Sequence, residues 1–296
     1  MKIIITGSLG HISKPLAEEL VNKGHDITVI SSKQDKQKDI EAIGAKAAIG
    51  SLEDVDFLTK TFTGADAVYC MEPPGNFFDQ SFDYLKYTEE LSNNFAQAIQ
   101  QSSVKRVVHL SSIGAHTNKG NGILAFHYYA EQILNSLSSD VSIVFMRPVG
   151  FYYNLFSFVH AIKAQGAITT NYGGDLEEPW VSPTDIAVVI AEEITTPFIG
   201  RKIRYVASDE LTCNKVAEIL GKAIGKPGLK WIVIPDEQLL NGMLATGMNP
   251  GVAKGLVEMN ASRRNGILYE DYYLNKPILG KVKMEDFAKE FAAAFK

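Results

Sequence analysis

The chain has 296 residues, of which 46% are hydrophobic and 21% charged, an ordinary globular composition that excludes a disordered or low-complexity protein. Its 29 basic and 34 acidic residues give a net charge of −5, and no Lys or Arg cluster forms a stripe that could follow a nucleic-acid backbone. Its two cysteines, Cys70 and Cys213, are too few for a disulfide framework and lack zinc-site spacing. We therefore expect a globular protein that binds neither nucleic acid nor a metal ion.

The sequence contains no signal for secretion or membrane insertion. The first apolar run reaches the glycine turn at Gly7 after a few residues, too soon for a signal peptide. The most apolar long stretch, residues 142–162, includes Arg147, Asn154 and His160, whose polar groups a membrane would leave unsatisfied. We therefore expect a cytoplasmic protein with no membrane partner.

Short apolar segments alternate with helix-like segments through the first half of the chain, which predicts a parallel sheet covered by helices on both faces. The expected strands are residues 2–6, 26–31, 45–49, 67–71, 107–111 and 142–147. The expected helices between them are residues 11–23, 35–43, 52–62, 78–101 and 123–137.

From about residue 151 the alternation fades, and aromatic residues, Gly and Asn become denser. Helical patterns remain at residues 183–195, 211–224 and 284–295. No Pro- or Gly-rich linker separates the two halves. The predicted fold class is therefore α/β, with a Rossmann-type doubly wound parallel sheet in residues 1–150. Residues 151–296 form a smaller C-terminal α/β substrate lobe that packs on the sheet and is not an independent domain.

A glycine turn, Thr6-Gly7-Ser8-Leu9-Gly10-His11-Ile12-Ser13, lies between the first strand and the first helix. This is the context of a dinucleotide-binding turn, in which Gly7 makes the tight turn and Gly10 lets the backbone approach a pyrophosphate. Free N–H groups at the start of the helix favour the phosphate charge. A plain strand-to-helix turn is the alternative, but it does not need two glycines at this spacing. The predicted cofactor-binding residues here are Gly7, Ser8, Leu9, Gly10, His11 and Ile12.

The turn resembles the Thr-Gly-Ala-Thr-Gly motif of the NmrA-like branch of the atypical short-chain dehydrogenases/reductases. Met146-Arg147-Pro148 through Asn154 is similar to the Leu-Arg-Pro segment of that family, and further likeness extends over nearly the whole chain. The resemblance implies the fold predicted above and an activity like that of the NAD(P)H:quinone oxidoreductases.

The end of the second expected strand indicates which nicotinamide cofactor binds. The acidic residue that an NAD site uses to hold the ribose 2′-OH is absent, and Ser32 and Lys33 occupy this region instead. Ser32 stands where the resemblance implies an NADP-binding Arg, so the bidentate clamp on the 2′-phosphate is missing. We predict NADP(H) as the cofactor with NAD(H) as the alternative, and a merely solvated loop at Ser32 and Lys33 is a further alternative.

Further cofactor contacts are expected at the carboxyl ends of the strands, where such sheets bind ligands. They are Ser51, Met71, Ser111 and Pro148.

The resemblance also indicates what is missing from the catalytic apparatus. The Tyr-x-x-x-Lys pair of short-chain dehydrogenases is replaced by Ile123 and His127, and the literal match at Tyr272 and Lys276 lies in an irregular segment before a proline. His127 and Glu131 resemble the His-x-x-x-Glu of the family. We predict His127 as the catalytic residue, which either hydrogen-bonds the nicotinamide ribose or donates a proton; a packing role is the alternative.

Hydride transfer needs stacked, well-oriented partners, because the nicotinamide supplies the hydride. The resemblance implies that such a protein reduces electron-poor acceptors, such as quinones or azo and triarylmethane dyes, without the Tyr-Lys pair. Aromatic residues near the strand ends suit a flat acceptor, although aromatics at helical spacing also build cores. The predicted substrate residues are Phe77, Tyr128, Phe151 and Tyr152.

The predicted function is therefore an NmrA-like oxidoreductase that transfers a hydride from NADPH to a small electron-poor acceptor such as a quinone. A regulatory protein that senses NADP(H) without turnover is the alternative, and a sugar-nucleotide epimerase is a remote one because it needs the missing Tyr. We expect a monomer or a homodimer.

Overall fold

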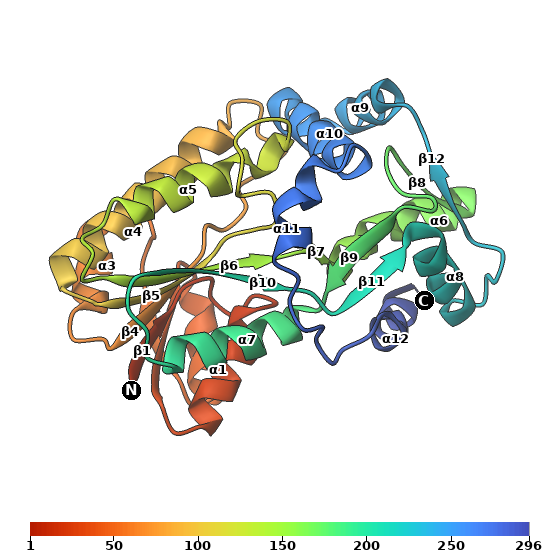
Figure 1. The fold of residues 1–296 in the computed structure, drawn as a ribbon. Helices are drawn as coiled ribbons and strands as arrows, with labels where there is room; N and C mark the ends of the chain where they lie inside the picture. Colours follow the sequence, from red (N-terminus) through yellow and green to blue (C-terminus); the bar gives the residue numbers. More distant parts are fainter. Residues whose placement is uncertain (296) are drawn as a thin grey trace.

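A computed structural model describes residues 1–295 and is built on a seven-stranded parallel sheet (Figure 1). The strand order is β10-β6-β5-β4-β1-β2-β3, in which the chain starts near the centre and moves first to one edge and then to the other. The strands are β1 (Lys2–Ile5), β2 (Asp26–Ser31), β3 (Lys46–Ile49), β4 (Ala67–Cys70), β5 (Arg106–Leu110), β6 (Ser142–Pro148) and β10 (Arg201–Val206). The predicted Rossmann-type doubly wound fold is confirmed.

Helices cover both faces of this sheet (Figure 1). One face carries α1 (Ser13–Asn22), α2 (Gln37–Ala42) and α7 (Pro183–Thr195), and the other carries α3 (Val55–Phe62), α4 (Tyr84–Ser102) and α5 (Ala125–Asn135). Short 3-10 helices precede α2 (η1, Gln34–Lys36) and α5 (η2, Gly122–Leu124). None of the helices described within residues 1–295 combines the length and the apolar character needed to cross a membrane.

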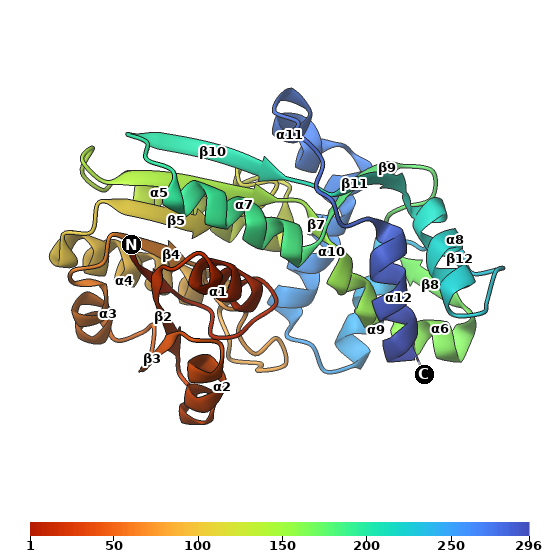
Figure 2. The same cartoon turned by 90° about the horizontal axis from the view of Figure 1, so that it is seen from below.

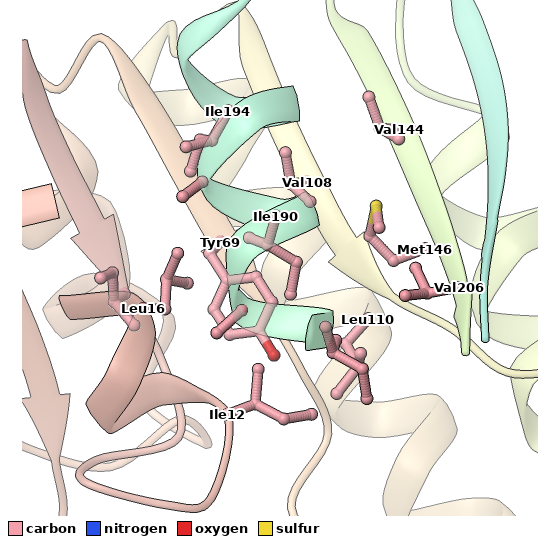
Figure 3. Packing of buried hydrophobic residues seen from close by; sticks show 14 of the residues in the cluster. Ile12, Leu16, Tyr69, Val108, Leu110, Val144, Met146, Ile190, Ile194 and Val206 are labelled. Atoms are coloured by element: carbon pink, nitrogen blue, oxygen red, sulfur yellow. The ribbon is translucent and has the colours of Figure 1, made fainter. Parts of the chain in front are cut away.

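Alternate residues of the central strands point to opposite faces, so each face has its own core. Figure 3 shows one of them, in which Leu16 of α1 and Ile190 and Ile194 of α7 pack with Val108 of β5 and Met146 of β6. The opposite face buries residues such as Leu58, Phe95 and Phe145 under α3 and α4. Two layers of helices therefore hold the sheet rigid and fix the carboxyl ends of its strands.

A smaller lobe lies beyond the carboxyl ends of the strands (Figure 2). It has a three-stranded sheet of β7 (Gly150–Phe151), β9 (Glu177–Val181) and β11 (Asp209–Thr212), and a pair of β8 (Ala167–Thr170) with β12 (Lys230–Val233). Its other elements are η3 (Tyr152–Phe158), α6 (Val159–Gln165), α8 (Cys213–Ala223), α9 (Asp236–Ala245), α10 (Pro250–Arg264), η4 (Ile267–Tyr269), α11 (Glu270–Leu274) and α12 (Met284–Phe295). A third core around Trp180, Trp231 and Phe291 holds this lobe together.

Two elements beyond residue 150 belong to the sheet layer, although the sequence analysis assigned them to the C-terminal lobe. Strand β10 pairs in parallel with β6, and α7 packs against α1. The unit built on the sheet therefore contains residues from both sides of the predicted division at residue 150. β10 carries Lys202 and Arg204, which lie near Glu193 of α7, because an edge strand exposes part of its surface to water. This charged sequence lacks the apolar run by which the other strands are recognised.

Candidate functional site

The glycine turn between β1 and α1 has a backbone that ordinary side chains do not tolerate. Gly7 has a φ of +85°, and a Cβ at this position would lie 2.7 Å from Ser13 Oγ. Ser8 also has a positive φ, of 54°. Its N–H donates to the carbonyl oxygen of Ile30 at 3.0 Å, and its Oγ lies 3.0 Å from Ser31 Oγ. These bonds attach the turn to the end of β2 and hold Ser8 in the left-handed region.

Ser13 occupies the third small position of the turn. Its hydroxyl donates to the carbonyl oxygen of Thr6 at 2.8 Å, and the hydroxyl of Thr6 accepts from the N–H of Met71 at 3.0 Å. A chain of hydrogen bonds thus connects the first turn of α1 to the ends of β1 and β4. Serine therefore adds a bond where the usual glycine only gives room for close packing.

The N-terminus of α1 is available to an anion. Ile12 is the N-cap residue and supplies no side-chain hydrogen bond, and the first turn contains no acidic residue. The first N–H groups of a helix lack partners within the helix and carry the positive end of its dipole. This end of α1 can therefore hold a phosphate group against the glycine turn.

A cavity of about 440 Å³ opens at this turn, within the range of small-molecule and cofactor sites. One part is bounded by the ends of β2 and β3 together with α4, and the other by the ends of β4 and β5 together with the start of the lobe. The first part is lined by Ile30, Ser31, Ser32, Ser51, Leu52, Glu53, Tyr87 and Leu91. The second is lined by Tyr69, Met71, Pro73, Pro74, Leu110, Phe151 and Tyr153. Between them lie Gly7, Ser8, Gly10, His11, Ile12 and Ser13.

The cavity brings together most of the residues predicted from the sequence to bind the cofactor. Those at its wall are Gly7, Ser8, Gly10, His11, Ile12, Ser32, Ser51 and Met71, with Phe151 from the predicted substrate set. The other predicted cofactor residues, Leu9, Lys33, Ser111, His127 and Pro148, do not line it. Leu9 packs against the sheet core, and Ser111 and Pro148 are buried at the ends of β5 and β6. The roles of all these residues stay predictions.

At the end of β2, the region predicted to select the cofactor is solvent-exposed. Ser32 and Lys33 are exposed, and Ser31 Oγ accepts from the N–H of Lys33 at 3.2 Å. Lys33 forms no ion pair with any of residues 1–295, so its ammonium group is free to meet a phosphate. Glu53 is the one acidic side chain at the cavity wall among the described residues.

At the opposite end, the glycine turn meets the lobe through an aromatic stack. The ring of His11 lies over the ring of Tyr153 with centroids 4.6 Å apart and an interplanar angle of 21°. Phe151 packs against the same Tyr153 ring at 5.4 Å. Together with Pro73 and Pro74, which also line the cavity, these rings give it flat apolar surface. Aromatic faces of this kind stack on planar ligands.

His127 lies on α5, half-buried, with its ring 3.7 Å from the ring centroid of Phe126. Burial lowers its pKa well below the ordinary value, and the nearby charges of His109 and Arg147 act in the same direction. Its Nδ1 is buried and has no hydrogen-bond partner among the described residues. The imidazole is therefore neutral near pH 7, so it can form hydrogen bonds but is not poised to donate a proton as an imidazolium.

Ile123, which stands where short-chain dehydrogenases carry their Tyr, packs against a helix of the lobe. A Cβ placed on Gly255 of α10 would lie 3.2 Å from Ile123 Cβ. The Ile123 side chain is therefore packed against the backbone of α10. The titratable side chains in the cavity lining are those of His11, Glu53, Tyr69, Tyr87 and Tyr153.

A chain of buried polar groups begins at the ends of β5 and β6. Ser111 Oγ donates to Glu131 Oε1 at 2.5 Å. Arg147 binds both carboxylate oxygens of Glu131, at 2.9 and 2.6 Å, and also donates to Asp271 Oδ2 at 2.9 Å. Tyr205 donates to the same Asp271 oxygen at 2.6 Å. Elements α5, β6 and α11 are therefore joined through one guanidinium group.

A second buried ion pair lies at the ends of β4 and β5. His109 Nε2 is 3.0 Å from Glu72 Oε2, and Ser92 of α4 donates to Glu72 Oε1 at 2.9 Å. Burial opposes protonation of His109, but the charge and the hydrogen bond of Glu72 together outweigh it and raise the pKa of the imidazole. The ion pair with Glu72 thus favours the protonated form of His109, whose charge lowers the pKa of His127.

Three of the four predicted substrate residues lie outside the cavity wall. Tyr152 is 1% exposed, in the core of the lobe, where its hydroxyl donates to Asp209 at 2.8 Å and to the carbonyl oxygen of Val282 at 3.2 Å. Phe77 packs edge-on against Tyr84, and Tyr128 against Tyr129. The neighbour of Tyr152, Tyr153, lines the cavity instead.

The residues that the sequence analysis did not select as cofactor or substrate contacts reach the cavity from several elements. They include Tyr69 on β4, Glu53 before α3, Tyr87 and Leu91 on α4, and Tyr153 in η3. Pro73 and Pro74 follow a strand whose carboxyl end was expected to contribute to a ligand site, so their place in the sequence indicated that they lie near it. Within the part of the chain that is described, no group of three or more His, Cys, Asp or Glu side chains is arranged to hold a metal ion.

A family model described as NAD(P)H-binding matches residues 7–197, from the glycine turn to just beyond α7. The chain is 23% identical to the NAD(P)H azoreductase of Xenophilus azovorans over 296 residues, and this match covers 99% of each protein.

Two solved structures share the fold over almost their whole length. One is the NADPH-dependent quinone oxidoreductase QOR2 of Escherichia coli in complex with NADPH, with a TM-score of 0.79 and 19% identity over 99% of this chain and 100% of that one. The other is the triphenylmethane reductase of Citrobacter sp. in complex with NADP(H), with a TM-score of 0.79 and 18% identity over 98% of this chain and 99% of that one.

Proposed function

Because the chain belongs to the NAD(P)H-binding family, we propose that it is an oxidoreductase that transfers a hydride from NADPH to a small electron-poor acceptor such as a quinone. The relatives agree with the NmrA-like resemblance of the sequence, and two of them are named as reductases of dyes and one as a reductase of quinones. The observation that carries the proposal is the cavity itself, which joins a phosphate-binding glycine turn to a flat aromatic end.

The chain's own residues would bind and orient the cofactor. The N-terminus of α1 and the backbone of Gly7 and Gly10 would hold the diphosphate, while Ser32 and the free ammonium of Lys33 would meet a 2′-phosphate. The nicotinamide supplies the hydride when the cofactor is bound. Tyr153 and Phe151 would stack a planar acceptor and exclude water from one of its faces.

The proton needed after hydride transfer would come from water. A quinone that has accepted a hydride is an anion that water can protonate, and no Tyr-Lys pair is present to do so. His127 would contribute a hydrogen bond to the nicotinamide ribose, because its imidazole is neutral near pH 7.

One observation supports a second candidate, an NADP(H)-sensing regulatory protein. The helix that carries the Tyr-Lys pair in short-chain dehydrogenases has Ile123 and His127 instead, and neither lines the cavity, so binding without turnover would be compatible with the site. A sugar-nucleotide epimerase is not favoured, because such an enzyme needs that Tyr and Ile123 packs against α10 instead. Two free buried cysteines support a cytoplasmic location, and a monomer or a homodimer remains our expectation.

The deciding experiment mixes the purified protein with NADPH and a panel of quinones and azo dyes and follows the absorbance of the reduced nicotinamide. Oxidation of NADPH that depends on both protein and acceptor supports the oxidoreductase. Saturable NADPH binding without oxidation by any acceptor favours the sensor, and absence of binding to either nicotinamide cofactor contradicts both.

A further inference from the structure

Tyr69, on β4, is a buried tyrosine that lines the cavity. The side chain is 0% exposed, and its ring packs in the apolar core beneath the glycine turn. Figure 3 shows the hydroxyl pointing away from the centre of this core, toward Ile12 at the start of α1 and toward Leu110 at the end of β5. Both of these residues line the same cavity as Tyr69.

No group within residues 1–295 meets the geometry of a hydrogen bond with the Tyr69 hydroxyl. The nearby hydroxyl of Ser13, which acts to lower the pKa of Tyr69 against the larger effect of burial, already donates to the carbonyl oxygen of Thr6 at 2.8 Å. Buried hydroxyl groups almost always have a hydrogen-bond partner, because an unsatisfied polar group costs free energy that a core phenylalanine would not. The sequence thus places a Tyr where Phe would pack equally well in the unliganded protein. An occupant of the cavity is the remaining source of a partner.

The chemistry of the surrounding groups indicates what that occupant is. The open N-terminus of α1 and the turn at Gly7 and Gly10 lie at the same wall and are suited to an anion. Burial raises the pKa of Tyr69, so the hydroxyl keeps its proton and acts as a donor. A neutral donor beside an anion-binding helix end complements a phosphate oxygen.

We propose that Tyr69 is a cofactor-binding residue whose hydroxyl donates to the diphosphate of the bound dinucleotide, directly or through one ordered water. This inference rests on the proposed NAD(P)H site and adds to it a contact from strand β4. It accounts for the unpaired hydroxyl of Tyr69: the free protein carries the cost of desolvation, and the bound cofactor removes it.

The test is Tyr69→Phe, which removes only the oxygen atom. We expect the melting temperature of the unliganded variant to equal or exceed that of the wild type, because an unsatisfied buried group is lost. We expect the Kd for NADPH, measured by calorimetry, to rise about tenfold, because bonds to charged acceptors are stronger than neutral ones. ADP-ribose, which keeps the diphosphate but lacks nicotinamide, should show the same loss.

Tyr272→Phe is the matched control. Tyr272 is also 0% exposed, but its hydroxyl donates to Glu210 at 2.8 Å and lies outside the cavity wall. Here the melting temperature should fall while the Kd stays unchanged.

Three results would overturn the inference. The first is an unchanged Kd in a folded Tyr69→Phe protein. The second is a lowered melting temperature for that variant, which would show that the hydroxyl has an internal partner such as Ser13. The third is a loss of NADPH affinity without a loss for ADP-ribose, which would remove the assignment to the diphosphate. If the wild type binds neither NADPH nor NADH, the proposed function itself fails, which is a separate outcome.

Discussion

Glu131 of α5 and Arg147 of β6 form a bidentate ion pair whose side chains are only 4% and 5% exposed. Arg147 Nη2 lies 2.6 Å from Glu131 Oε2, and Nε lies 2.9 Å from Oε1. The pair joins the helix that carries His127 to the strand that ends at Pro148. It also reaches the lobe through Asp271, so it fixes the relative positions of α5, β6 and α11.

Replacing Glu131 by Gln should destabilise the protein strongly. The buried Arg147 charge would lose its bidentate partner, and breaking one side of a buried ion pair costs about 3–5 kcal/mol. Urea denaturation measures the loss of unfolding free energy. Glu218→Gln is the control, because Glu218 and its partner Lys222 are 42% and 65% exposed and water can replace the lost carboxylate. Equal losses for the two variants would show that burial of the Glu131–Arg147 pair has no special weight.

Gly10→Asp should abolish dinucleotide binding. A Cβ at this position would lie 3.1 Å from the carbonyl oxygen of Gly7, and the carboxylate would stand where the diphosphate is proposed to bind. Calorimetric titration with NADPH measures the effect. Gly242→Asp on α9 introduces the same side chain into open space and should bind normally. Retained NADPH affinity in a folded Gly10→Asp protein would remove the turn from the cofactor site.

Ser32→Arg should increase the preference for NADPH over NADH. A guanidinium group can clamp the 2′-phosphate with two hydrogen bonds, which a serine hydroxyl cannot do. Competition titrations give the ratio of the two Kd values, which should rise about tenfold, in line with the energy of charge-assisted bonds. Asn93→Arg, on an exposed face of α4 outside the cavity wall, controls for the added charge. The proposed cofactor preference is contradicted if wild-type protein binds NADH more tightly than NADPH.

His127→Ala should reduce cofactor affinity or turnover more than stability. Because the pKa of His127 is lowered, its imidazole is uncharged at and above the ordinary histidine value of about 6.5, so the wild-type rate should show no ionisation of His127 in that range. If the side chain acts through the ribose, the loss should appear in the Kd for NADPH. His160→Ala, exposed on α6, is the control. A rate that rises as pH falls through this range, and does so only when His127 is present, would instead support an imidazolium proton donor.

Much of the fold follows from local patterns in the sequence. The apolar run of β2 is predicted at Asp26–Ser31, and α7 and α12 are predicted with their observed ends. Capping residues explain part of this accuracy, since Ser182 caps α7 and Pro183 begins it. The glycine turn is equally local, because the motif between Thr6 and Ser13 can be recognised from the spacing of its glycines and from the flanking strand and helix.

The tertiary structure alone decided which distant side chains share the cavity. Four separate segments contribute Tyr69, Glu53, Tyr87 and Tyr153 to its wall. The sequence predicted Tyr152 as a substrate residue, but it is the next residue, Tyr153, that lines the cavity. Both residues lie in the 3-10 helix η3, where adjacent side chains point in different directions, so one ring reaches the core and the next the cavity.

The same limit applies to charges and to edge strands. The sequence shows that Glu131 lies near His127 on one helix. It does not show that Arg147 forms ion pairs with both Glu131 and Asp271. It also does not reveal β10, whose charged residues become a strand only when β6 offers an edge to pair with. Local periodicity and turn chemistry act over a few residues and are written in the sequence, whereas pairing and burial depend on contacts that exist only once the chain has folded.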